Sequence, residues 1–304
     1  MKLVREGISG ARVVESAVNR GVAGGYNLAR ESARGEFVVL LHDDAEVRPG
    51  WLEALVNAAD ECPAAGAVGS RTLDPDGTLQ AAGAIVWRDG MTEPVGRGEP
   101  AGSSAYRLRR RVDYCGSNSL LVRAATWDAV GGMDEALFPA YHVDVDLGMK
   151  IRAHGQLVLY EPTSEVTHHR WGLEAENAFR MFAARRNQRR FVEKWRSALA
   201  SHVPREGGNL DEALARVEHE PAANWTASLP DPGRLSDADY LRADLALKDA
   251  YIAGFERRHA EGDRALREVA ELRKQLAGIK NSRIWRLHEL LLPVLKLVSR
   301  RKPI

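Results

Sequence analysis

The chain has 304 residues, of which 44% are hydrophobic and 28% charged, a composition that excludes collagen-like and wholly disordered proteins. Its 43 basic and 42 acidic side chains leave a formal charge of +1, which argues against nucleic acid as a partner. Two cysteines are too few for a disulfide framework, and the lack of an apolar leader or of an apolar run of about 18 residues predicts a cytoplasmic protein.

The first part of the chain, from residue 13 to about residue 171, alternates short apolar runs with segments of helical periodicity. Five apolar residues at 37–41 predict a strand that is buried on both faces. Pro49 is placed to begin a helix, because Leu52 and Leu55 follow at helical spacing. Further strands are predicted at 67–69, 84–87, 119–122 and 157–160, and a helix at 146–152. Strands separated by helices indicate an α/β sheet with parallel members.

The rest of the chain predicts helices on either side of a linker. Residues 174–200 are strongly basic and helical in pattern, whereas residues 204–232 carry Pro, Gly, Asn and Asp without periodicity. We therefore predict a domain at 1–200, a linker at 201–236 and a helical tail at 237–304. Glycines interrupt the heptads of the tail, so a coiled coil is one interpretation of it.

The end of the tail, residues 284–302, combines an apolar face that contains Trp285 with a basic terminus. This pattern is typical of a helix that lies on a membrane surface, and it makes peripheral membrane contact one expectation. A helix that packs on its own domain or on a partner explains the pattern equally well, and the tail also makes a homo-oligomer an expectation.

The most informative local feature is the run His42-Asp43-Asp44, which directly follows the predicted strand 37–41. Open α/β sheets bind their ligands at this end of their strands. Neighbouring carboxylates repel each other unless a cation or a positive side chain offsets them, and Mg²⁺ or Mn²⁺ is commonly held by one or two carboxylates together with substrate phosphates. The pattern indicates a metal site, with an ordinary solvated loop as the alternative.

Two further signals follow along the chain. Asp144 and Asp146 open the predicted helix, where a carboxylate gains from the helix dipole. They are therefore helix-capping residues, or one of them is a general base for a substrate hydroxyl. His168 lies just after a strand and is either structural or a metal ligand, since imidazole is a common ligand of transition metals.

In this order the segments resemble the family 2 glycosyltransferases with the GT-A fold, particularly the bacterial rhamnosyltransferase-like group, over about residues 12–200. The segments that carry the resemblance are 19–27, 35–44, 49–52, 74–83, 131–135, 144–147, 160–162, 168 and 186–187, with 282–287 in the tail. The resemblance implies an α/β, GT-A-like (Rossmann-like) mixed sheet flanked by helices, followed by a C-terminal helical tail.

The resemblance also implies a reaction, namely inverting transfer of a sugar from a nucleotide-sugar donor to a hydroxyl of a glycan or lipid-linked acceptor in surface polysaccharide or cell-wall synthesis. Its cofactor would be Mn²⁺ or Mg²⁺. Asp44 matches the carboxylate that binds the metal, and His168 matches a position that completes the metal site in some relatives. Asp144 matches the catalytic base. His42 stands where the family has another acidic residue, and Val143 where it has a glutamate.

Other positions are assigned by the same resemblance. Those expected to bind the donor are Asn19, Gly21, Asn27 and Asp43, and the one expected on the acceptor side is Asp146. The family normally begins with a strand, a helix and a second strand that hold the nucleotide. A βαβ unit takes about 30 residues, more than precede Val13, so we expect an N-terminally incomplete fold. A second hypothesis follows, in which the chain is a non-catalytic scaffold or binding module at the inner face of the cell membrane.

Overall fold

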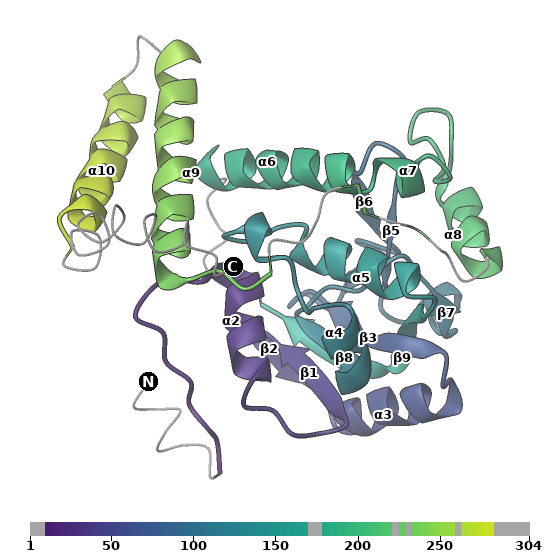
Figure 1. The fold of residues 1–304 in the computed structure, drawn as a ribbon. Coiled ribbons are helices and arrows are strands. Elements are labelled where there is room, and N and C mark those ends of the chain that lie inside the picture. The colour runs from purple at the N-terminus through teal and green to yellow at the C-terminus, as the bar shows by residue number, and fades with distance from the viewer. Residues whose placement is uncertain are drawn as a thin grey trace, which may run out of the picture. The chain divides into compact units, whose positions relative to one another are not determined.

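The computed structural model describes residues 10–169, 178–220, 225, 227–228, 233–258 and 263–282. The chain divides into two compact units (Figure 1). The larger unit is Val22–Gly233, and the smaller one combines Met1–Gly21 with Arg234–Ile304. The larger unit contains the sheet and the candidate site.

A mixed seven-stranded sheet forms the centre of the larger unit. Its main path runs in the order β1 (Phe37–Leu41), β8 (Ser119–Arg123), β3 (Ala65–Leu73), β9 (Leu157–His168) and β2 (Ala45–Val47). On either side of this path β4 (Leu79–Ala81) pairs with β3, and β7 (Arg110–Arg111) pairs with β9. Because β8 is antiparallel to both β1 and β3, while β3 and β9 are parallel, the strands β1, β3 and β9 all end at the same edge of the sheet.

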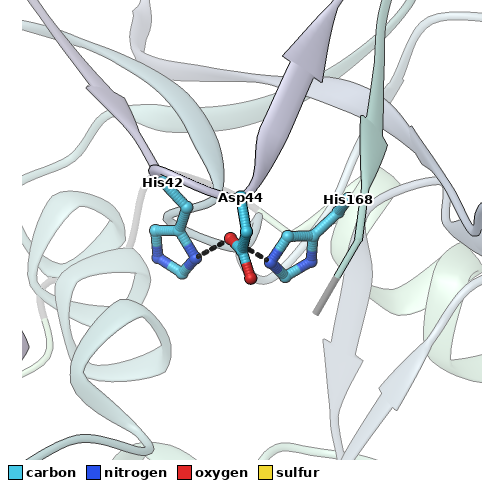
Figure 2. A group of neighbouring side chains, drawn as sticks. All are labelled: His42, Asp44 and His168. Atoms are coloured by element: carbon cyan, nitrogen blue, oxygen red, sulfur yellow. Dashed lines mark ion pairs between the residues drawn. The ribbon is translucent and has the colours of Figure 1, made fainter. Parts of the chain in front are cut away.

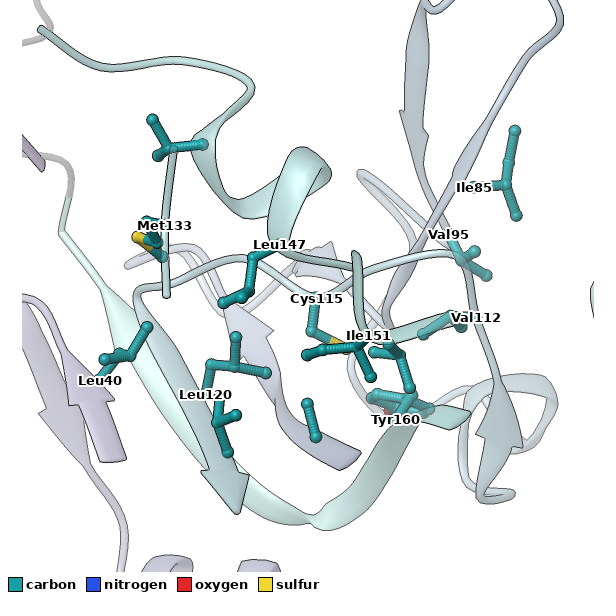
Figure 3. Packing of buried hydrophobic residues seen from close by; sticks show 14 of the residues in the cluster. Leu40, Ile85, Val95, Val112, Cys115, Leu120, Met133, Leu147, Ile151 and Tyr160 are labelled. Atoms are coloured by element: carbon teal, nitrogen blue, oxygen red, sulfur yellow. The ribbon is translucent and has the colours of Figure 1, made fainter. Parts of the chain in front are cut away.

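Helices cover both faces of this sheet. Helix α3 (Trp51–Glu61) packs Leu55 against Leu121 on one face. Helix α5 (Val143–Ala153) packs Leu147 against Leu120 on the other face (Figure 3). Consecutive residues of β8 thus enter opposite cores, as the alternation of a strand requires. The α/β class, the sheet and its flanking helices are confirmed.

The other elements of the larger unit surround this framework. They are the helices α2 (Gly21–Arg30), α4 (Ala124–Ala129), α6 (Ala178–Lys194), α7 (Arg196–Leu199) and α8 (Leu210–His219), the 3₁₀ turns η1 (Ser104–Tyr106) and η2 (Glu135–Leu137), and the two-stranded sheet of β5 (Ala84–Val86) and β6 (Thr92–Pro94). Phe191 of α6 and Trp195 are fully buried beside Met149 of α5, so α6 is tied to the helix that opens with Asp144.

Several element boundaries differ from the sequence prediction, and three of the differences have a clear physical reason. Helix α3 begins at Trp51 rather than at Pro49, because Gly50 adopts a left-handed φ of 78° in front of it. Strand β9 continues through Pro162 to His168 instead of ending at residue 160. Its pairing with β3 jumps from Glu161 to Glu165, and this bulge accommodates a proline that lacks the N–H of a regular ladder.

The third difference lies in the predicted linker 201–236, which contains helix α8. Asn209 caps this helix by accepting a hydrogen bond from the Glu212 amide at 2.9 Å. Ala213 and Val217 are buried, so α8 packs as part of the domain. The Pro- and Gly-containing segments that flank these ten residues hide their periodicity in the sequence.

The described part of the smaller unit contains the helices α9 (Asp237–Arg258) and α10 (Asp263–Lys280), which contact each other. The Tyr251 hydroxyl of α9 donates a hydrogen bond to Glu268 of α10 at 3.2 Å. Arg20 joins the N-terminal part of this unit to the start of α9 by an ion pair with Asp237 at 2.5 Å. The predicted interfacial helix at 284–302 lies outside the described residues. Among the helices that are described, none has the length and apolarity to cross a bilayer.

Candidate metal and catalytic site

The shared edge of β1, β3 and β9 brings three of the predicted metal ligands together. After β1 ends at Leu41 the chain passes through residues 42–44 and enters β2, whose first residue, Ala45, pairs with His168 at the end of β9. The His169 amide also donates to the Asp44 carbonyl at 2.9 Å. The β2–β9 pairing therefore places Asp44 beside His168.

His42, Asp44 and His168 form a compact cluster in which the ligand atoms all lie within 4.8 Å of one another (Figure 2). Asp44 Oδ1 lies 3.1 Å from His168 Nε2 and 3.8 Å from His42 Nδ1. Metal–ligand bonds near 2.1 Å would put neighbouring ligands of an octahedral ion about 3 Å apart. The cluster fits a divalent cation, and its two imidazoles make it a better match for Mn²⁺ than for Mg²⁺.

In each imidazole, the ring nitrogen that does not face Asp44 has a hydrogen-bond partner. His168 Nδ1 lies 2.7 Å from Gln80 Oε1, and His42 Nε2 lies 3.3 Å from the Ser117 hydroxyl. Histidines that bind metals commonly use their second nitrogen in this way, because the hydrogen bond fixes the ring and the tautomer. Both imidazoles are thus held in place beside Asp44 by a second polar group.

Asp144 lies in the first turn of α5 and lines the same cavity as the metal cluster. The cavity has a volume of about 250 Å³ and is lined by His42, His168 and Asp144 among others. A second cavity of about 340 Å³ also includes His42 and Asp144. Asp144 Oδ1 accepts a hydrogen bond from the Val145 amide at 3.0 Å. The predicted base therefore lines two cavities, both of which include His42 and one of which also includes His168.

The loop that precedes Asp144 has a strained backbone and is hydrogen-bonded to helix α6. Tyr141 and His142 have φ values of 72° and 60°, which residues other than glycine rarely adopt. Asn187 of α6 is fully buried, and its amide donates to the carbonyls of Leu137 at 2.5 Å and Ala140 at 2.6 Å. Sequence reasoning assigned Asn187 no role, although the pair 186–187 contributed to the resemblance.

Nearby titratable groups are kept protonated by burial. Burial raises the pKa of Tyr26 above its usual value, and the charges of Asp144, Asp43 and Asp44 add to the effect. Its hydroxyl donates to the Ser117 carbonyl at 3.3 Å. Burial likewise raises the pKa of Cys115 to about 12, so the thiol that lines the cavity is not a nucleophile at neutral pH.

Two residues predicted to bind substrate are buried structural residues instead. Asn27 is 1% exposed, and its amide donates to Glu135 and to the Met133 carbonyl, each at 2.8 Å. Asp146 is 0% exposed and accepts from Trp195 Nε1 at 2.7 Å, with Lys194 Nζ at 2.9 Å. We therefore replace the donor-side role of Asn27 and the acceptor-side role of Asp146 with structural ones.

The remaining predicted donor residues lie elsewhere. Asp43 is exposed and lines neither cavity described above. Asn19 Oδ1 accepts from the Gly21 amide at 2.9 Å, which caps the start of α2. Both Asn19 and Gly21 belong to the smaller unit, so their part in donor binding stays a prediction.

Comparison of the sequence with known proteins shows what the chain is similar to. The model of glycosyl transferase family 2 matches residues 2–128, which include β1 and the His42–Asp44 loop. Over these residues the chain is similar to that family. Among curated proteins, the N-acetylglucosaminyl-diphospho-decaprenol L-rhamnosyltransferase of Mycobacterium tuberculosis is 34% identical over 169 residues, or 51% of this chain and 55% of that protein.

Two other proteins match parts of the chain. The O-antigen biosynthesis protein RfbC of Myxococcus xanthus is 33% identical over 151 residues, which are 47% of this chain and 12% of that protein. The matches thus cover about half of the rhamnosyltransferase and a small part of RfbC. The solved structure of GalNAc-T7 with UDP, GalNAc and Mn²⁺ is matched with a TM-score of 0.49 and 14% identity, over 70% of this chain and 44% of that one.

Proposed function

We propose that the chain is an inverting glycosyltransferase, which moves a sugar from a nucleotide-sugar donor to a hydroxyl acceptor in surface polysaccharide or cell-wall synthesis. The observation that carries the proposal is the single cavity that Asp144 lines together with His42 and His168. A group able to take a proton and a group able to hold a metal diphosphate are thereby brought to one place. The names of the two curated relatives support the biosynthetic setting.

The metal end of the cavity would bind the donor. His42, Asp44 and His168 would hold Mn²⁺ or Mg²⁺, and the bound ion supplies a Lewis acid that neutralises charge on the nucleoside diphosphate. The protein's part is to hold the two imidazoles and the carboxylate in place, through Gln80 on one side and Ser117 on the other.

Asp144 would act on the acceptor. Its carboxylate takes the proton of the acceptor hydroxyl while the hydroxyl oxygen bonds to the anomeric carbon from the face opposite the leaving group. The bond from that carbon to the diphosphate breaks, and its electron pair leaves with the nucleoside diphosphate. The second cavity supports placing the acceptor beside Asp144, because His142 and Tyr141 line it as well.

The acceptor class follows from the relative rather than from the cavity. The mycobacterial relative is named for a diphospho-decaprenol substrate, so we infer a lipid-linked acceptor here and a site of action at the inner face of the cell membrane. Contact of residues 284–302 with that membrane is part of the same proposal. Deletion of these residues should then reduce sedimentation of the protein with anionic liposomes at low salt.

The experiment that tests the activity is nucleotide release from a panel of nucleotide sugars by the purified chain, with and without Mn²⁺. Asp144→Asn should lower turnover by about 10²–10⁴-fold, the usual contribution of a general base. Asp60→Asn, an exposed change on α3, serves as the control and should be neutral. Unchanged turnover in Asp144→Asn would show that Asp144 is not the base. Absence of both turnover and nucleoside diphosphate binding would instead favour the non-catalytic scaffold or binding module, whereas tight, metal-dependent binding of a nucleoside diphosphate would rule it out.

A further inference from the structure

The segment 74–83, Asp-Pro-Asp-Gly-Thr-Leu-Gln-Ala-Ala-Gly, has no role in the mechanism above although it belongs to the sequence resemblance. Its residues 74–78 form the turn between β3 and β4, and residues 79–81 are β4. Gly77 adopts a φ of 84°, and Asp76 Oδ1 accepts hydrogen bonds from the Thr78 amide at 2.9 Å and hydroxyl at 2.7 Å. The turn brings β4 alongside β3 and carries Gln80 to the cavity that contains the metal ligands.

The orientation of the Gln80 amide follows from its neighbour Asp74. Gln80 Nε2 donates to Asp74 Oδ1 at 2.7 Å. A carboxylate only accepts hydrogen bonds, so the amide nitrogen must face Asp74 and the amide oxygen must face the other way. That oxygen lies 2.7 Å from His168 Nδ1. His168 Nδ1 therefore carries the proton that is donated to Gln80.

This proton position determines which nitrogen of His168 binds a metal. In a neutral imidazole with hydrogen on Nδ1, the lone pair is on Nε2. Nε2 is the atom that lies 3.1 Å from Asp44 Oδ1. Two acceptor atoms then face each other, and a cation bound by both replaces their repulsion by attraction.

We propose that Gln80, oriented by Asp74, is a positioning residue that holds His168 in the tautomer required for binding a divalent cation. The inference rests on the metal site of the proposed function and deepens it, since it assigns the segment 74–83 to that site. Outer partners of metal-binding histidines typically contribute about 10–100-fold to metal affinity.

The test is calorimetric titration of the purified full chain with Mn²⁺ alone, so that no sugar donor is needed. Gln80→Leu removes the acceptor and should weaken Mn²⁺ binding by about 10–100-fold. Gln188→Leu is the matched control, because Gln188 is a half-buried glutamine on α6 that donates to the Asp89 carbonyl away from the metal ligands. Its affinity for Mn²⁺ should equal that of the parent.

Exchanging the amide and the carboxylate between positions 74 and 80 tests whether Gln80 acts by orienting His168 or only by packing against it. Gln80→Glu alone places two carboxylates against each other, and Asp74→Asn alone lets the Gln80 amide turn around, so each should weaken Mn²⁺ binding. Combining them restores the chain of hydrogen bonds, because the amide at position 74 donates to the carboxylate at position 80, which accepts from His168. The double variant should bind Mn²⁺ within about threefold of the parent or more tightly, whereas a merely structural role predicts that the two losses add.

The outcomes distinguish this inference from the proposed function. No Mn²⁺ binding by the parent chain would overturn the metal site itself and the inference with it. Parent-like affinity of a folded Gln80→Leu protein, or no recovery in the double variant, would overturn the inference alone. If Gln80→Leu does not fold, the exchange variants decide. ¹⁵N NMR of the metal-free protein gives a second readout, since hydrogen on His168 Nε2 instead of Nδ1 would also refute the inference.

Discussion

Two groups of side chains, Asp134 and Asp146 with Lys194, and Asp44 with His42 and His168, offset their negative charge in different ways. In the first group, Asp134 and Asp146 are buried and share Lys194 Nζ, which lies 2.9 Å from each of them. In the second group, the ion pairs that the described residues form with Asp44 come from His42 and His168, and no lysine or arginine contributes one.

This difference indicates which group is structural and which is functional. Lys194 supplies a permanent positive charge, and its carboxylate neighbours raise its pKa although burial opposes them. The first group therefore holds positive charge of its own, with Lys150 as a second positive side chain near Asp146. The imidazoles of His42 and His168 supply ligand atoms and no permanent charge, so the second group gains most when a cation binds. Asp146 is thus paired with a buried lysine, whereas Asp144, two positions before it on α5, lines the cavity.

The largest expected effect is loss of the built-in charge of the first group. Lys194→Met leaves two buried carboxylates without the lysine that pairs with both and should lower the free energy of unfolding by about 3–5 kcal/mol, measured by denaturant titration. Lys248→Met is the control, since Lys248 forms only an i,i+4 pair with Asp244 on α9 and should change stability by less than about 1 kcal/mol. Equal effects of the two variants would remove the distinction drawn above.

The buried imidazole of His202, which belongs to neither group, predicts a pH dependence of the free energy of unfolding. His202 is fully buried near Asp113 and Arg216, and its Nδ1 donates to the Val86 carbonyl at 2.7 Å. Burial lowers the pKa of His202 from 6.5 to about 4, although Asp113 opposes the shift. Below about pH 6.5 the unfolded chain therefore binds a proton that the folded chain does not, and stability declines until about pH 4.

The size of this loss is roughly 3 kcal/mol, since each pKa unit corresponds to about 1.4 kcal/mol. Unfolding titrations between pH 7 and pH 4 measure it. His202→Asn should flatten the slope over this range, whereas His154→Asn, an exposed change, should not. An unaltered slope in His202→Asn would show that other groups cause the acid sensitivity.

The third expected effect is an increase in the free energy of unfolding when a divalent cation binds Asp44, His42 and His168. Mn²⁺ at about 100 times its dissociation constant should raise the free energy of unfolding by about 2.7 kcal/mol, because it binds only the folded state. Removing one ligand by His168→Ala should abolish most of this gain, and Lys248→Met should leave it intact. Full stabilisation of His168→Ala by Mn²⁺ would place the ion elsewhere.

The sequence was sufficient for much of the second group. The apolar run 37–41 predicted β1, and the position of His42 and Asp44 directly after it predicted a site at the end of the sheet. That His168 joins them follows from the pairing of Ala45 with His168. No local pattern shows this pairing, so the resemblance to a family was needed to connect the two segments.

The buried position of Asp146 in the first group could not be predicted from the sequence, for a physical reason. Asp146 follows Asp144 by two positions, and the start of a helix explains both carboxylates equally well. Whether each faces a cavity or the core depends on its partner, and Lys194 lies 48 residues away in the sequence. The same holds for Asn27, because its partners Met133 and Glu135 are more than 100 residues distant.

The smallest expected effect bears most directly on the comparison, because it concerns Asp44 in the metal-free protein. Asp44→Asn removes a carboxylate whose side chain is 16% exposed and whose nearest described ion-pairing atom is His168 Nε2 at 3.1 Å. If that nitrogen carries a lone pair, an amide at position 44 donates to it where the carboxylate repelled it. The free energy of unfolding in EDTA should therefore stay within about 1 kcal/mol of the parent value or rise slightly, while Mn²⁺ no longer stabilises the variant. A loss in EDTA as large as that of Lys194→Met would instead mean that Asp44 is held by a buried counter-charge, and the two groups would then be of one kind.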